Sequence, residues 1–229
     1  HIAKEEPDYV AAASTNATDV EEAKQKNLKD GIPTMRALLH EMCDILDPMW
    51  LKLATNRNGT HILRTLLVTL HSESVNEKAL FENVVQVLLK ALNMSRWIVD
   101  KISGPILVML IEMIEPASDL YNTLVSKVLG LASTSAFEKI KTAESEQLKG
   151  RLVEYCNHEV ASHVIEAIVK SAPPRIFDSL YSFGFRTQLA TMSTSRYANF
   201  IVAQIIERAT SKEQFELMYT ELLEQNLNN

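Results

Sequence analysis

The chain has 229 residues, of which 46% are hydrophobic and 23% charged, and its formal net charge is −6. This apolar fraction excludes a disordered chain, and no apolar run approaches the roughly 18 residues that a membrane span requires. Two cysteines are too few for a disulfide framework, which favours a reducing compartment. A pI near 5.6 is also unusual for a nucleic-acid binder. The first 50 residues hold five Lys or Arg against ten Asp or Glu, so the rest of the chain is almost neutral.

Residues 1–32 are polar and lack a sustained apolar period, which predicts an acidic linker or loop with one polar helix near Val20–Asn27. From Pro33 onward, apolar residues recur at spacings of three and four almost to the end, and the alternation typical of strands is missing. Pro48 and Pro174 stand where a helix can begin without losing a hydrogen bond. The pattern predicts an all-α chain of about ten to twelve helices.

One short segment recurs four times: a small residue, a small or polar residue, a ring (imidazole, proline or phenyl), and then apolar residues. The four instances are Gly59–Arg64, Ser103–Val108, Ala161–Glu166 and Ala198–Ala203. We expect each to continue as an apolar helix and to follow two further helices, the second of them short. This predicts three-helix repeats at about residues 33–72, 75–115, 117–171 and 173–209, and a partial repeat at 211–229. Ser133–Gly150 is predicted to be an insertion, and the incomplete last repeat leads us to expect a longer protein.

The polar side chains of the recurring segment have a spacing that suits base recognition. Residues i and i+4 of a helix share a face and residue i+1 lies beside them, so Ser162, His163 and Glu166 form one cluster. Two polar groups can read the edge of a splayed-out nucleobase while a ring stacks on its face. An array with one such trio per repeat would read single-stranded RNA base by base.

The three-helix repeat and its recurring segment resemble Pumilio (PUF) RNA-binding repeats. The closer likeness is to the nucleolar Pumilio-like branch that binds precursor ribosomal RNA during small-subunit biogenesis, and it covers about residues 33–229. The histidine-containing segments, the degenerate proline segment and the Leu180–Arg208 stretch carry the resemblance. It implies an armadillo-like α-solenoid in the nucleus or nucleolus, with single-stranded RNA and ribosome-assembly proteins as partners. It implies no cofactor, no membrane contact and no small-molecule substrate.

The resemblance also assigns roles to individual residues. The edge-reading pairs would be Thr60 with Arg64, Ser162 with Glu166, and Asn199 with position 203, and the second pair looks like the guanine-reading combination of the family. Position 203 is Ala where Gln would complete a uracil reader, although Gln204 follows it. The candidate RNA-binding residues are therefore Thr60, His61, Arg64, Ser162, His163, Glu166, Asn199, Phe200 and Gln204, with His61, His163 and Phe200 as stacking rings.

Several features favour structural roles instead. Gly59, Ala161 and Ala198 suit close helix packing at least as well as an approach to RNA. Ser162 and Glu166 equally suit the solvated start of a helix, and Arg64 suits a phosphate or a neighbouring acid. The second segment offers Gly104, Pro105 and Val108, which supply neither a hydrogen-bonding side chain nor a stacking aromatic ring, so backbone spacing or protein contact is expected there.

Catalytic motifs find no support in the sequence. His158-Glu159-Val160-Ala161-Ser162-His163 is one residue longer than the H-E-x-x-H zinc motif, and this places the two imidazoles about 140° apart on a helix. The sequence therefore predicts a binding protein and not an enzyme. Two hypotheses follow: an RNA-binding α-solenoid, or a protein-interaction solenoid of the same architecture that has lost most RNA contacts. The in-register trios of Thr, Ser or Asn with His or Phe favour the first hypothesis, whereas the near-neutral body, the empty second segment and Ala203 are the observations behind the second.

Overall fold

The computed structural model describes residues 33–72, 77–91, 93–131 and 142–227, and it divides into two compact units at residue 46. The described part of the first unit is helix α2 (Met35–Leu46), in which Leu39 and Cys43 are buried. The predicted linker at residues 1–32, with its polar helix, lies outside the described residues.

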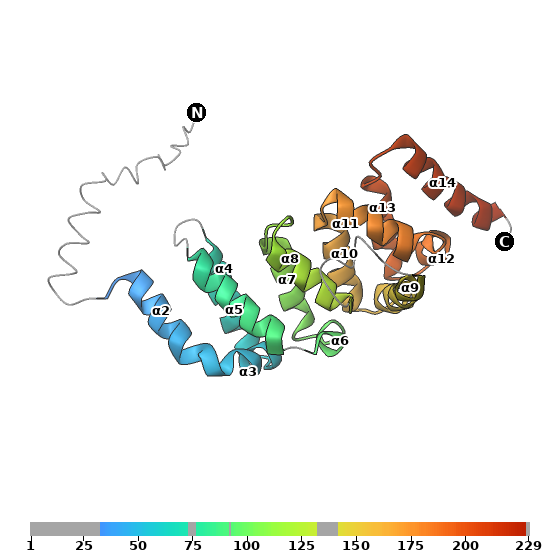
Figure 1. The fold of residues 1–229 in the computed structure, drawn as a ribbon. Coiled ribbons are helices and arrows are strands. Elements are labelled where there is room, and N and C mark those ends of the chain that lie inside the picture. Colours follow the sequence, from blue (N-terminus) through green and yellow to red (C-terminus); the bar gives the residue numbers. More distant parts are fainter. Residues whose placement is uncertain (1–32, 73–76, 92, 132–141, 228–229) are drawn as a thin grey trace, which may run out of the picture. The chain divides into compact units, whose positions relative to one another are not determined.

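The described part of the second unit is a succession of helices (Figure 1). They are, in chain order, η1 (Asp47–Met49), α3 (Trp50–Thr55), α4 (Gly59–His71), α5 (Lys78–Ala91), α6 (Met94–Trp97), α7 (Gly104–Met113), α8 (Asp119–Val128), α9 (Thr142–Cys156), α10 (Ala161–Ser171), α11 (Pro174–Leu180), the π-helical turn η3 (Tyr181–Phe185), α12 (Leu189–Ser193), α13 (Ala198–Glu207) and α14 (Lys212–Leu227). No strand occurs among the described residues, so the predicted all-α class is confirmed. Within the same ranges, no helix is both long and apolar enough to cross a bilayer.

The four recurring segments begin four helices that pack as one row, α4, α7, α10 and α13. Helix α7 packs on α4 and on α10, and α10 packs on α13. The residue two places after each ring position faces the core, and all four such residues are at most 4% exposed: Leu63, Leu107, Ile165 and Val202. Residues at the same position of the four segments therefore have the same orientation toward the core in the structure.

The small residues that open the segments serve helix packing, as one of the two interpretations predicted. Ala161 and Ala198 are fully buried. Gly59 is also buried, and a Cβ at this position would lie 2.9 Å from both the Cα and the carbonyl oxygen of Leu53 in the preceding helix. Since these are backbone atoms, a larger residue would force α3 and α4 apart.

The second half of the predicted insertion at Ser133–Gly150 is helical, which the sequence did not lead us to expect. Residues 133–141 lie outside the described ranges, but residues 142–150 form the first part of α9. Leu148, Leu152 and Cys156 are spaced by one helical turn and are all buried, so a narrow apolar stripe holds an otherwise polar helix in place. The polar composition of 142–150 conceals this stripe.

Candidate nucleic-acid interface

Each helix of the row begins on a turn that one side chain holds from a fixed position, five residues before the ring. The four residues that hold it are hydrogen-bond acceptors: Asn56, Asp100, His158 and Ser195. Each accepts from the backbone N–H groups two and three residues further on, at 2.9 and 3.0 Å, 2.9 and 2.8 Å, 3.1 and 3.3 Å, and 3.4 and 3.3 Å respectively. These bonds satisfy N–H groups that a helix start leaves without partners, and so they fix where each recurring segment begins.

Asp100 makes this turn sensitive to pH. Burial of its carboxyl acts to raise the pKa, but hydrogen bonds from the N–H groups of Ser103 and Ile102 and from the Ser103 hydroxyl outweigh burial and hold the pKa below its ordinary value. The carboxylate therefore stabilises the fold above the pKa that Asp100 has in the unfolded chain. This contribution is lost as the pH falls through the lowered pKa of the folded state.

We expect Asp100→Ala to lower the free energy of unfolding by about 1–2 kcal/mol at pH 7, because two N–H groups lose their acceptor. Asp100→Asn keeps an acceptor oxygen, as Asn56 does, and should cost less. Urea unfolding of the two variants and the parent chain at pH values from 7 to 3 checks both expectations. The deficit of each variant relative to the parent chain should shrink as the pH falls, and a deficit that stays constant with pH would contradict the role of the carboxylate.

A groove of about 460 Å³ lies on the row between α4 and α10, with α7 beneath it. Its apolar surface is supplied by Gly104, Pro105, Val108, Met109 and Val160, and its polar groups are Arg64, Lys101, Glu112, Glu159 and His163. Arg64 comes from α4 and His163 from α10, so the guanidinium and imidazole belong to helices on either side of α7. The second recurring segment, which the sequence presented as empty, provides the floor of this groove.

The predicted site residues fall into three levels of exposure. His61, His163, Asn199 and Phe200 are exposed, and Phe200 shows 62% of its surface although it is a large apolar ring. Arg64, Glu166 and Gln204 are half-buried, and Thr60 and Ser162 are buried.

Only some of the predicted groups come together. Arg64 and His163 line the same groove, and a carboxyl oxygen of Glu166 lies 3.7 Å from Nδ1 of His163. The residues on α13 are outside the groove, and the Gln204 amide donates a hydrogen bond of 3.1 Å to Glu207.

The two predicted hydroxyl readers sit deeper than the rings beside them. The Ser162 hydroxyl donates to the carbonyl of Glu159 at 3.5 Å, whereas Oγ1 of Thr60 is buried without a hydrogen-bond partner. A buried hydroxyl without a hydrogen-bond partner costs stability, so this depth disfavours Thr60 as a direct reader of a base edge. The pairing of Thr60 with Arg64, and of Ser162 with Glu166, stays a prediction.

An ion pair joins the turn before α7 to the turn before α10. Nζ of Lys101 lies 2.9 Å from a carboxyl oxygen of Glu159, and both side chains are largely exposed. The hydrogen bond and charge of Lys101 hold the pKa of Glu159 below its ordinary value, and the charges of His158 and Arg196 act in the same direction. Glu159 thus lies within the field of cationic groups from both neighbouring turns.

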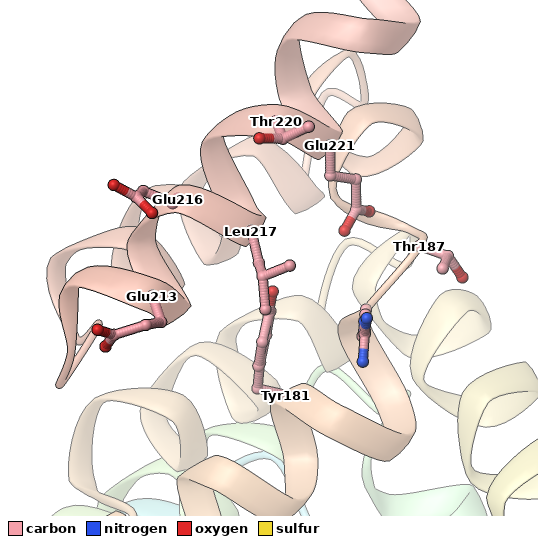
Figure 2. Close-up of a pocket in the computed structure, with 8 residues that line it drawn as sticks. Tyr181, Thr187, Glu213, Glu216, Leu217, Thr220 and Glu221 are labelled. Carbon is pink, nitrogen blue, oxygen red and sulfur yellow. The ribbon is translucent and has the colours of Figure 1, made fainter.

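A second cavity, of about 680 Å³, lies between η3 and α14, away from the row. In Figure 2 the Tyr181 ring rises from η3 toward Leu217 of α14. Glu221 accepts a hydrogen bond of 2.7 Å from the N–H of Leu189 and so ties α14 to α12. Three glutamates and one arginine line this cavity, a balance that disfavours a phosphate chain. We therefore place the candidate interface on the row.

The two histidines that resembled a zinc motif have separate roles. His158 uses Nδ1 to hold the turn before α10, while His163 lines the groove. In the described ranges, no three His, Cys, Asp or Glu side chains gather closely enough to hold a metal ion. Burial raises the pKa of the Cys156 thiol to about 12, which keeps this thiol protonated near neutral pH.

Comparison with known proteins identifies the repeats. The family model described as the NOP9-like PUF repeat domain matches residues 2–84 and 78–228. Pumilio homolog 23 of Arabidopsis thaliana is 23% identical in an alignment 229 positions long, which covers 84% of this chain and 30% of that protein.

Solved structures of APUM23 share the fold. The structure described as APUM23-GGAGUUGACGG superposes with a TM-score of 0.70 at 19% identity, over 93% of this chain and 42% of that chain. The structure of a form with its insert region deleted, with GGAAUUGACGG, superposes with a TM-score of 0.69 at 21% identity, over 90% of this chain and 38% of that chain. The chain spans less than half the length of these relatives. The predicted helical array of Pumilio type is confirmed, and the chain belongs to the NOP9-like PUF repeat family.

Proposed function

We propose that the chain binds single-stranded RNA along the row of α4, α7, α10 and α13. The observation that carries this proposal is the groove, in which an apolar floor lies between the Arg64 guanidinium and the His163 imidazole. Nucleobases stack on flat rings and on guanidinium planes, and their faces are apolar. The groove floor formed by Pro105 and Val108 lies between a planar guanidinium and a planar imidazole, and it suits the apolar face of a base.

The exposed rings extend this surface beyond the groove. His61 precedes the groove on α4 and Phe200 follows it on α13, each at the ring position of its segment. An exposed phenyl ring at the same segment position as His163 is free to stack on a base. Because the body of the chain is almost neutral, we expect stacking to supply a large share of the binding free energy.

We further propose that the RNA is precursor ribosomal RNA of the small subunit, bound in the nucleolus alongside ribosome-assembly proteins. Membership of the NOP9-like family supports the ribosomal assignment, and the uridine-containing oligonucleotides in the related APUM23 structures support RNA as the ligand. In this role the chain is a binding module without catalytic activity, and it takes the RNA without a cofactor.

The proposal is tested by fluorescence anisotropy with labelled GGAGUUGACGG and with a random pool of single-stranded RNA. We expect saturable binding at about 0.15 M salt, weaker binding of DNA of the same sequence, and a loss of at least about tenfold for Val108→Glu, which places a carboxylate on the groove floor. Leu223→Glu is the matched control, because Leu223 is exposed on α14, outside the row, and does not line the groove.

Equal affinities for Val108→Glu and Leu223→Glu would remove the groove from the interface. Failure of the parent chain to bind either RNA sample would contradict the proposed function, and capture of an assembly protein in its place would establish the protein-interaction alternative.

A further inference from the structure

The four turns that begin the row present a charged residue at one shared position, four residues before the ring. These residues are Arg57, Lys101, Glu159 and Arg196, and all four are exposed. Each directly follows the acceptor residue that holds its turn, so the turn geometry places the four side chains alike. Three of the four positions are cationic in a chain whose body is almost neutral.

Glu159 is the exception, and the structure shows what it does. It pairs with Lys101 of the preceding turn at 2.9 Å, and the charge of Arg196 in the following turn also acts on it. Lys101 and Glu159 both line the groove, so their ion pair lies directly beside the surface proposed for the bases. The Glu159 carboxylate therefore interrupts a row of cationic side chains and forms an ion pair with the ammonium of Lys101.

We propose that these four turns form a second binding row, which takes the phosphates of the RNA whose bases lie in the groove, and that Glu159 competes with phosphate for Lys101. The proposal rests on the proposed function and adds the contacts to the backbone. Phosphate oxygens accept hydrogen bonds from ammonium and guanidinium groups, and such contacts position a strand without reading its sequence. An exposed ion pair contributes little to stability, so phosphate can displace Glu159 at small cost.

The ion pair thereby restrains non-specific binding. With Lys101 engaged by Glu159, a strand gains little from phosphate contacts alone and must supply bases that fit the groove. We expect removal of the Glu159 charge to raise the affinity for all single strands and to reduce the discrimination between sequences.

The test is Glu159→Gln in the complete 229-residue chain, with binding of the random RNA pool measured by anisotropy between 50 and 300 mM salt, a span of roughly one decade chosen to resolve the slope. We expect a gain of about threefold to tenfold near 0.1 M salt, and a plot of log affinity against log salt that is steeper by about 0.7, the value for one additional phosphate contact with a single strand. In the Lys101→Gln background the gain should vanish. Glu216→Gln on α14 is the matched control, since it removes an equal charge from the exposed pair with Lys212 outside the row.

Equal effects of Glu159→Gln and Glu216→Gln, or a gain that persists in the Lys101→Gln background, would overturn the phosphate row. If Val108→Glu still weakens binding in that case, the groove stands and only the row is wrong. Absence of RNA binding in both the parent chain and Glu159→Gln would overturn the row together with the proposed function.

Discussion

Replacing His163 and Phe200 together by alanine is expected to weaken single-stranded RNA binding by about 30-fold to 20,000-fold. Each of the two rings is proposed to stack on one base, and stacking contributes about 1–3 kcal/mol to the binding free energy for each base. Both side chains are largely exposed, and His163 makes only a long contact of 3.7 Å with Glu166. Their removal should therefore leave the free energy of unfolding almost unchanged, so that a loss of affinity reports on RNA contact.

The matched control is the double substitution Phe215→Ala and Tyr219→Ala on α14. These two rings are exposed and stack on each other with centroids 6.2 Å apart, but they lie outside the row. Titrations of the single and double variants should show losses that are nearly additive for His163 and Phe200, because the two rings lie on different helices. Equal losses in the test and control pairs would contradict stacking on the row.

Arg208→Met is expected to lower the free energy of unfolding by about 2–4 kcal/mol, the largest stability effect we predict. The Arg208 guanidinium donates hydrogen bonds to the carbonyls of Val169, Lys170 and Ala172 at the end of α10. It also lies 4.9 Å from the centroid of the Phe177 ring. One side chain at the end of α13 thus closes the end of α10 and holds the two helices together.

Urea unfolding followed by circular dichroism measures this effect. Arg208→Lys should be intermediate, because a single ammonium cannot reproduce the fork that reaches three carbonyls. Lys170→Met, at the same helix end and exposed, removes an equal charge without breaking these contacts and should cost less than about 0.5 kcal/mol. A midpoint for Arg208→Met that equals that of Lys170→Met would show that the carbonyls find other partners.

The sequence was sufficient for the helices whose apolar spacing is strong and whose ends are marked. The short helix predicted ahead of the first recurring segment is α3, and the recurring segments begin α4, α7, α10 and α13 within one residue. It was insufficient for the first half of α9, because the buried stripe there is only one residue wide. Periodicity reports how much of a helix is buried, and a narrow stripe in a polar segment gives a weak signal.

The acceptors before each helix were missed for a different reason. Asn56, Asp100, His158 and Ser195 differ in charge, size and hydropathy and share only a lone pair at the required place. Alignment of the segments on their ring positions would have revealed the common spacing. The groove was out of reach of any such alignment, because Arg64, Pro105 and His163 are far apart in the chain and meet only when three helices pack.

The central claim, that RNA lies along the row, is tested most directly by cross-linking the chain to single-stranded RNA that contains 4-thiouridine and identifying the modified peptides by mass spectrometry. We predict cross-links in the peptides that carry His61, Pro105, His163 and Phe200. Cross-links confined to α5, α8, α11 or α14, with none on α4, α7, α10 and α13, would contradict the claim.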